Sequence, residues 1–252
     1  GVILKQPSEL KTLLKSITDR RQFHRISDTK GYSGAYLYDI YSLFCNSCVN
    51  NESFEDWFAL NYPDQAEFAA IYDDILREFE ETKVQFNYAD FNDLLIKMRN
   101  ELKNGSAICF DEILVDEYQD TNSLQGSLID AFNTKSLFCV GDFDQSIYAF
   151  NGANIEIIGS FKERYIGANI YSLNINYRSS AKILALANKV IANNPRLYPK
   201  SLEVSRDGEF KSPVLLVYDE LFVQYSAVAE IIAKSRYHKS DIAIIFRNNS
   251  SA

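Results

Sequence analysis

The stretch that most constrains this chain is ILVDEYQDTN at residues 113–122, where an apolar run of strand-forming residues ends abruptly in two carboxylates. A buried strand of a parallel sheet has this composition, and such sheets place ligand chemistry beyond the carboxyl ends of their strands. A second apolar run, LFCV at 137–140, leads in the same way to Asp142 and on to Gln145. Two strands that deliver acids and amides at one edge predict a site for a metal ion and a nucleotide. The alternative is that these acids only cap strands and begin helices.

Composition narrows the class of protein. The 252 residues are 46% hydrophobic and 24% charged, which is typical of a soluble globular protein, and no apolar run approaches the ~20 residues that span a membrane. The net charge of −8 argues against binding of nucleic acid by bulk charge, although 13% aromatic residues leave room for a local stacking groove. Cys45 and Cys48 form a CxxC pair without a second pair at zinc-site spacing, so core packing is the simpler interpretation, with a metal or redox role as the alternative. We expect a reducing, cytoplasmic location.

The pattern changes twice along the chain. Residues 1–87 are predicted to be helical, and residues 88–172 and 173–252 alternate strands with helices, which is typical of parallel α/β sheets. The apolar spacing and capping residues predict helices from Ser8, over 35–49, from Asp64, over 88–105, 122–132 and 155–165, from Ser179 or Ser180 to 191, and over 221–236. Strands are predicted over 112–116, 136–141, 214–218 and 241–247.

Three motifs in this order carry a family resemblance: ILVDEYQDTN at 113–122, VGDFDQSIYAFNGA at 140–153 and LNINYRSS at 173–180. They resemble motifs II, III and IV of the UvrD/Rep/PcrA helicases of superfamily 1, and DFNDLL at 90–95 and DIAIIFRNN at 241–249 resemble two further elements of that family. The resemblance implies an α/β fold with parts of two RecA-like parallel-sheet domains. Residues 1–87 would be a helical 1B-like subdomain, 88–172 the C-terminal half of domain 1A, and 173–252 the N-terminal part of domain 2A.

The resemblance also implies roles for individual residues. Asp116 would hold Mg²⁺, because this hard cation prefers carboxylate oxygen, and Glu117 would position and deprotonate the water that attacks the γ-phosphate of ATP. Gln145 would sense the γ-phosphate. Arg178 would reach it from domain 2A as an arginine finger, and Tyr177 would stack on the adenine base. ATP and Mg²⁺ are therefore the expected cofactors.

Three neighbouring residues correspond to positions near single-stranded DNA in the family. Tyr148 and Phe150 would stack on bases, although both could instead pack in the core. Asn151 stands where the family usually has arginine, and we assign it to the nucleic-acid contact with weaker coupling to the ATP site. The expected partners are single-stranded DNA and junctions of single- and double-stranded DNA, and no membrane.

The sequence contains no GxGKT stretch, which would form the phosphate-cradling loop, and lacks the late motifs of domain 2A. We therefore expect an internal fragment of an ATP-dependent DNA helicase or translocase, with 3′–5′ movement, that is inactive in isolation. Two alternatives stay open. In the first, the parent protein is a helicase–nuclease of the RecB or AddA kind. In the second, the chain is a degenerate module that binds nucleic acid or protein without catalysis.

Overall fold

The computed structural model describes residues 1–21, 33–47, 52–194, 202–205, 208 and 211–246. The chain divides into two compact units. Of the described residues, those up to Ser172 form the first unit and those from Leu173 onward form the second. Helices predominate, and the three strand pairs found in the described residues are all parallel. The fold is therefore mixed α/β and mostly helical. The assignment to RecA-like domains and a 1B-like subdomain stays a prediction.

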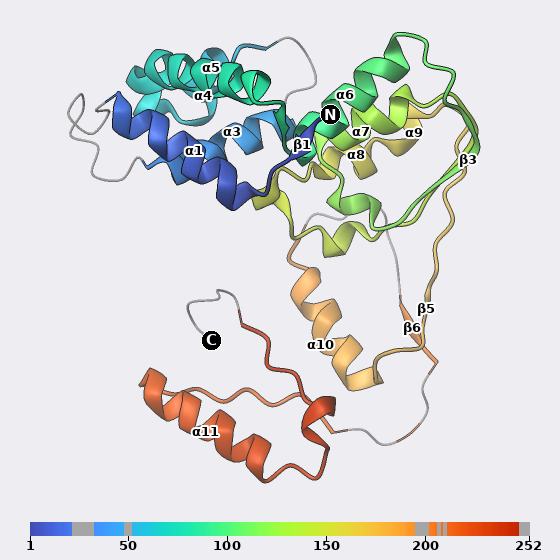
Figure 1. The fold of residues 1–252 in the computed structure, drawn as a ribbon. Helices are drawn as coiled ribbons and strands as arrows, with labels where there is room; N and C mark the ends of the chain where they lie inside the picture. Colours follow the sequence, from blue (N-terminus) through green and yellow to red (C-terminus); the bar gives the residue numbers. More distant parts are fainter. Residues whose placement is uncertain (22–32, 48–51, 195–201, 206–207, 209–210, 247–252) are drawn as a thin grey trace. The chain divides into compact units, whose positions relative to one another are not determined.

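Among the described residues, the N-terminal part of the first unit contains the helices α1 (Pro7–Arg20), α3 (Gly34–Ser47), α4 (Phe54–Asn61) and α5 (Ala69–Gln85), with the 3₁₀ helix η1 (Pro63–Phe68) before α5 (Figure 1). The helix predicted from Ser8 begins one residue earlier, because proline fits the first helical position, where its missing N–H has no partner to lose. The carboxylate of Glu9 accepts a hydrogen bond from the backbone N–H of Gln6 at 2.8 Å and so closes this first turn.

Helix α4 is absent from the predicted elements, and the helix predicted from Asp64 is 3₁₀ until Phe68. Only eight residues long, α4 is too short to show a clear helical period, and its apolar residues are mostly aromatic. Its N-terminus is capped by Ser53, whose side chain accepts a hydrogen bond from the N–H of Asp56 at 3.1 Å. The predicted end of the preceding helix at Val49 lies outside the described residues.

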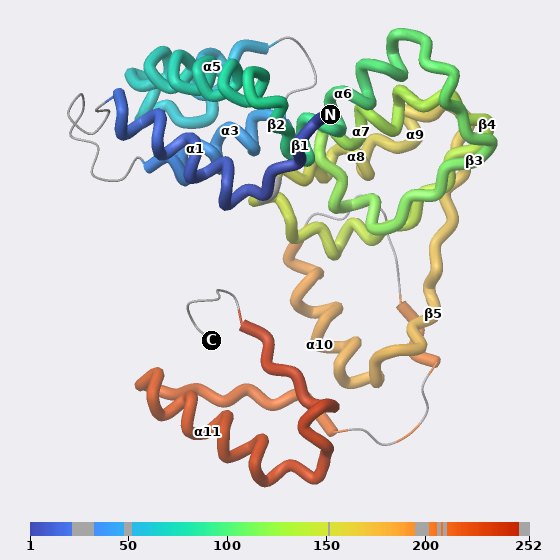
Figure 2. Tube along the Cα trace, viewed as in Figure 1, coloured from blue at the N-terminus to red at the C-terminus, as the bar shows by residue number. Residues whose placement is uncertain are grey.

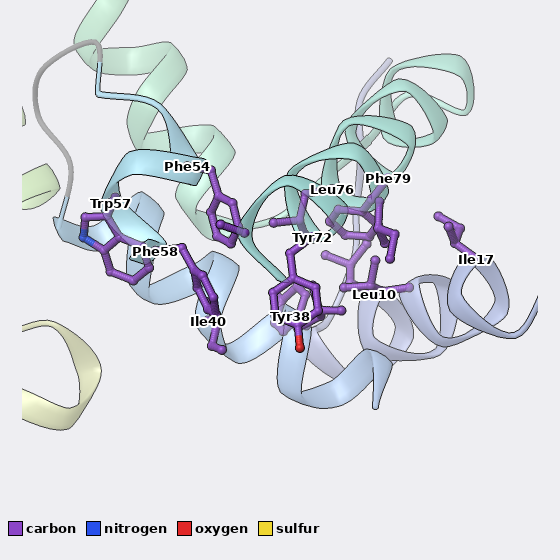
Figure 3. Close-up of a cluster of buried hydrophobic side chains, with 14 residues drawn as sticks. Leu10, Ile17, Tyr38, Ile40, Phe54, Trp57, Phe58, Tyr72, Leu76 and Phe79 are labelled. Carbon is purple, nitrogen blue, oxygen red and sulfur yellow. The ribbon is translucent and has the colours of Figure 1, made fainter. Parts of the chain in front are cut away.

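The buried side chains of α1, α3, α4 and α5 form one cluster, which we call the helical core (Figure 3). Aromatic rings dominate it. Phe58 is fully buried, stacks on Tyr62 at 5.0 Å between ring centroids, and meets Tyr72 edge-on at 5.2 Å. Such pairs contribute about 0.5–1.5 kcal/mol each beyond the area that they bury. The fully or nearly fully buried members are Leu10, Leu14, Ile17, Leu37, Tyr38, Ile40, Phe54, Trp57, Phe58, Ala69, Tyr72, Ile75, Leu76 and Phe79.

A cluster of charged side chains around the buried Lys83 joins the helical core to the next helix, α6 (Phe91–Lys103). The strand β2 (Tyr88–Ala89) precedes α6 and pairs in parallel with β1 (Ile3–Leu4). Lys83 of α5 is 2% exposed, and its Nζ lies 2.7 Å from a carboxylate oxygen of Glu80 and 2.9 Å from one of Asp93. Asp90 caps α6 by accepting a hydrogen bond from the N–H of Asp93. Burial lowers the pKa of Lys83, but the surrounding carboxylates outweigh it, and its pKa is raised.

The remaining part of the first unit alternates strands and helices, as predicted. Strands β3 (Phe110–Val115) and β4 (Thr134–Cys139) lie side by side in parallel, with Leu114 opposite Phe138 (Figure 2). Helix α7 (Ser123–Ala131) connects them. The predicted helix over 155–165 is two short helices, α8 (Ile155–Gly159) and α9 (Phe161–Arg164), separated at Ser160. Leu114 and Phe138 are 68% and 56% exposed, so the pair carries an apolar face.

The second unit contains β5 (Ile175–Asn176) paired with β6 (Glu203–Val204), the helices α10 (Ala181–Ile191) and α11 (Leu221–Ala233), and the 3₁₀ helix η5 (Lys239–Asp241). Helix α10 begins after Ser180, as predicted. The strands predicted over 214–218 and 241–247 are wrong for the residues that the structure describes. Their composition suits a strand, but a strand also needs a hydrogen-bonded neighbour, and 214–218 and 242–246 have none among the described residues.

Candidate active site

The carboxyl ends of β3 and β4 meet at one edge of the strand pair. Pairing continues beyond both strands, since the N–H of Val140 donates to the carbonyl of Val115 and the N–H of Tyr118 donates to the carbonyl of Val140, each at 2.8 Å. Asp116 and Glu117 therefore lie beside Asp142, although 26 residues separate Asp116 from Asp142 in the sequence. We call Asp116, Glu117, Gln119, Asp142 and Gln145 the strand-end site.

Glu117 occupies a left-handed backbone conformation, with φ 49° and ψ 43°. A residue with a Cβ is disfavoured there by about 1–2 kcal/mol, so the surroundings must hold this turn in place. Tyr118, next in the chain, is buried and meets Phe161 of α9 edge-on at 5.5 Å, and burial raises its pKa. The turn is thus anchored on its inner side by an aromatic contact, while Asp116 and Glu117 stay exposed.

Gln119 is a residue to which the sequence analysis gave no role. Its side chain is buried, at 2% exposure. Its Nε2 donates to Oε2 of Glu117 at 2.7 Å, and its Oε1 accepts from the backbone N–H of Asp142 at 2.9 Å. The signal that could have found it is a polar residue two positions after the second strand-end acid, next to an aromatic residue that must be buried to hold the turn.

Asp142 continues this chain of hydrogen bonds to Gln145. Its Oδ2 accepts from Nε2 of Gln145 at 2.8 Å, and its Oδ1 accepts from the backbone N–H of Asp144 at 3.1 Å. Gln145 itself is exposed, in the short 3₁₀ helix η3 (Phe143–Gln145). The structure therefore brings Asp116, Glu117 and Gln145 to one edge, with both ends of the set facing solvent.

The aromatic pair predicted to stack on bases lies just beyond, around the 3₁₀ helix η4 (Ala149–Asn151). Tyr148 is 44% and Phe150 74% exposed, and their ring centroids are 5.7 Å apart. Neither ring is buried in this chain, and base stacking by the two residues stays a prediction. Asn151 ends η4, and its side chain lies outside the described part. Gly152 has φ +84°, and an added Cβ would lie 3.0 Å from Cβ of Asn46 on α3, so this position requires glycine.

Tyr177 and Arg178 belong to the second unit, between β5 and α10. Both side chains are exposed, Tyr177 at 69%. The side chain of Asn176 shapes this turn, because its Oδ1 accepts from the backbone N–H groups of Arg178 at 3.1 Å and Ser179 at 2.7 Å. The predicted reach of Arg178 to the nucleotide stays a prediction.

The described segments contain no group of three or more histidine, cysteine or acidic residues that could hold a metal ion on their own. Mg²⁺ in nucleotide sites needs only one or two carboxylates, with phosphate and water as the other ligands, and an exposed Asp116 at the strand end fits that requirement. Cys45 is buried, and burial raises the pKa of its thiol to about 12, as expected for a core residue; Cys48 lies outside the described residues.

Comparison with known families fits both halves of the chain. Residues 4–166 match the family model of the UvrD/REP helicase N-terminal domain, and residues 171–252 match that of the UvrD-like helicase C-terminal domain. Motifs II and III lie within the first match and motif IV within the second. The chain belongs to the UvrD/REP family of ATP-dependent DNA helicases.

Curated relatives support the same family. A probable DNA helicase II homolog of Mycoplasma capricolum is 37% identical over 196 residues, which cover 73% of this chain and 26% of that protein. The putative ATP-dependent DNA helicase YjcD of Bacillus subtilis is 36% identical over 187 residues, or 70% of this chain and 24% of that protein. The ATP-dependent DNA helicase PcrA of Staphylococcus aureus is 37% identical over 173 residues, which cover 65% of this chain and 24% of that protein. The chain spans about a quarter of the length of these relatives.

None of the described helices is both long and apolar enough to cross a membrane.

Proposed function

We propose that this chain carries part of the ATP-hydrolysing site and of the DNA contact of a UvrD-type helicase that moves 3′ to 5′ along single-stranded DNA. The observation that carries the proposal is the strand-end site, where Asp116, Glu117 and Gln145 share one solvent-facing edge. A nucleotide needs this combination: a carboxylate for the metal, a base for the attacking water, and an amide that can meet a phosphate oxygen.

In this site Glu117 orients the attacking water and accepts its proton. Gln145 presents its amide to the γ-phosphate, and Asp116 would hold Mg²⁺. When bound, Mg²⁺ neutralises the charge that develops on the phosphate oxygens. From motif IV alone, we propose the arginine-finger role for Arg178 and the base-stacking role for Tyr177. No phosphate-cradling GxGKT loop occurs in these 252 residues, so we expect no turnover from this chain alone.

The DNA contact is assigned to Tyr148 and Phe150. Two exposed aromatic rings on a glycine-anchored turn suit base stacking, which is insensitive to sequence and contributes about 1–3 kcal/mol per base. This turn follows Gln145 by only a few residues. A shift of Gln145 on binding or loss of the γ-phosphate therefore has a short path to the stacked bases. Repeated closure and release around ATP would move the strand past this pair.

The test uses the full-length product of the gene. ATP hydrolysis is measured with and without single-stranded DNA and with Mg²⁺ removed by chelation, and unwinding is measured on duplexes with a 3′ or a 5′ single-stranded tail. We expect hydrolysis that DNA stimulates and chelation abolishes, together with unwinding from the 3′ tail. Binding of single-stranded DNA without any ATP hydrolysis would contradict the proposal and support the non-catalytic binding module.

A further inference from the structure

The buried amide of Gln119 connects the two strand ends of the site. Its side chain uses both ends of the amide: Nε2 donates to Glu117 at 2.7 Å, and Oε1 accepts from the N–H of Asp142 at 2.9 Å. A second, longer contact of 3.4 Å runs from Nε2 to a carboxylate oxygen of Asp120. The two protons of the amide nitrogen are therefore shared between two carboxylates.

These partners fix which way the amide points. Turned by half a rotation, its oxygen would face the carboxylates of Glu117 and Asp120, and its NH₂ group would face the N–H of Asp142. Both contacts would be repulsive, so only one orientation satisfies the site. Because the side chain is buried, water cannot readily replace a lost partner.

The backbone held by Gln119 also determines where Gln145 lies. Asp142, whose N–H bonds to Gln119, accepts a hydrogen bond from the side chain of Gln145 at 2.8 Å. The hydroxyl of Ser146 donates to the carbonyl of Gln119 at 3.3 Å, which ties the same segment a second time. Glu117 and Gln145 are thereby connected through two intervening side chains.

The packing around Gln119 leaves it little freedom to move. A Cβ added at Gly141 would lie 2.8 Å from Oε1 of Gln119 and 3.1 Å from its backbone nitrogen. Any larger residue at position 141 would displace the amide from the side of β4. The glycine two residues beyond the end of β4 is thus part of the same arrangement.

We propose that Gln119 is a positioning residue for ATP hydrolysis, which holds the carboxylate of Glu117 in its reactive direction and fixes the Asp142–Gln145 pair, so that the base and the phosphate sensor form one rigid set. The inference rests on the proposed function. Gln119 touches neither nucleotide nor water in this role; it acts through Glu117 and Asp142.

Gln119→Glu in the full-length product tests the proposal, because glutamate has the same shape and still accepts from the N–H of Asp142. Its second oxygen faces Glu117 and Asp120, so when ionised it repels Glu117, and when protonated it forces Glu117 to share that proton. We expect kcat for DNA-stimulated ATP hydrolysis to fall about 10–100-fold, the range for residues that orient a reacting group. The KM for ATP should stay near the wild-type value, whereas the unfolding midpoint should fall, because a third carboxyl group is now buried beside two others. Gly141→Ala removes no polar group but displaces the amide of Gln119, so it should also lower kcat.

The matched control is Gln125→Glu. Gln125 is exposed, and its side-chain oxygen accepts from the N–H of Asn122, which a glutamate oxygen also does. Its kcat should equal that of the wild type. An unchanged kcat in Gln119→Glu would overturn the inference, and so would a kcat that falls only at temperatures where the variant is partly unfolded, since that would show a structural role. Absence of hydrolysis in the wild type would instead overturn the proposed function, and the inference with it.

Discussion

Phe58 and Phe150 lie in the same compact unit, yet Phe58 is fully buried and Phe150 is 74% exposed. The difference reflects two regions that are held by different forces. The helical core is an apolar cluster of aromatic and aliphatic side chains, whereas hydrogen bonds around one buried amide hold the strand-end site, beside a strand pair with an exposed apolar face. The comparison teaches that stability and chemistry are separated in this unit, so substitutions should affect one without the other.

The largest effect on stability is expected from Phe58→Ala. Removal of this ring leaves a cavity between α4 and α5 and should lower the free energy of unfolding by about 3–5 kcal/mol. Chemical denaturation followed by circular dichroism measures it. A loss below about 1 kcal/mol would mean that the helical core is not the main source of stability.

A similar loss is expected from Lys83→Met. The substitution leaves Asp90 buried at 5% exposure, and Asp93 nearly so, without their cation, and removal of one partner of a buried ion pair costs about 3–5 kcal/mol. The same denaturation experiment measures it. Arg77→Met removes the exposed ion pair with Asp73 on the same helix, and this control should change the free energy of unfolding by less than about 1 kcal/mol.

The stability of the protein should also depend on pH because of Lys83. Because its pKa in the folded chain is raised above the ordinary value of 10.5, its stabilising contribution is complete below that value and is lost as the pH rises through the higher folded pKa. Wild-type unfolding midpoints should therefore fall above about pH 10.5, and Lys83→Met should flatten that part of the fall. Identical slopes in the two proteins would show that other groups cause it.

Phe150→Ala should affect DNA binding and leave stability nearly unchanged, which is the reverse of what we expect for Phe58→Ala. Loss of one stacking ring should weaken binding of single-stranded DNA by about 1–3 kcal/mol, whereas the free energy of unfolding should change by less than about 0.5 kcal/mol. Fluorescence anisotropy with a labelled oligonucleotide measures the affinity. If Phe150→Ala destabilised the protein as much as Phe58→Ala does, the pair would be part of a core.

The smallest effect is expected at Leu114, on the exposed face of β3. Leu114→Ala should change the stability of this chain by less than about 0.5 kcal/mol, because the side chain is 68% exposed. Leu14→Ala, in the helical core, should cost about 2–5 kcal/mol. Equal losses from the two leucines would show that the face of β3 is covered in solution.

Sequence reasoning predicted the helices best, because each long amphipathic helix repeats its burial pattern over several turns. Leu10, Leu14 and Ile17 show that repeat within α1. It also predicted β3 and β4, whose apolar runs end in acids. It did not predict α4, whose eight residues give too short a period, and it predicted strands over 214–218 and 241–247 from composition alone, without the partner that a strand needs.

Within the strand-end site, the motifs gave the acids and Gln145 but no role for Gln119. Its hydrogen bond to Asp142 joins residues 23 positions apart, and no local pattern encodes such a contact. The left-handed turn at Glu117 was equally hidden, because it depends on Tyr118 packing against Phe161 of α9. The sequence motifs therefore predicted which chemical groups form the site, whereas tertiary packing determines its geometry.

The central claim is that Glu117 is the base of an ATP-hydrolysing site whose loss leaves the fold intact. The direct measurement is DNA-stimulated ATP turnover of full-length Glu117→Gln, with its unfolding midpoint measured alongside and with Glu156→Gln, an exposed glutamate at the start of α8, as the control. We predict a fall in kcat of about 10²–10⁴-fold with an unchanged midpoint, and wild-type turnover in Glu156→Gln. Wild-type turnover in Glu117→Gln would contradict the account.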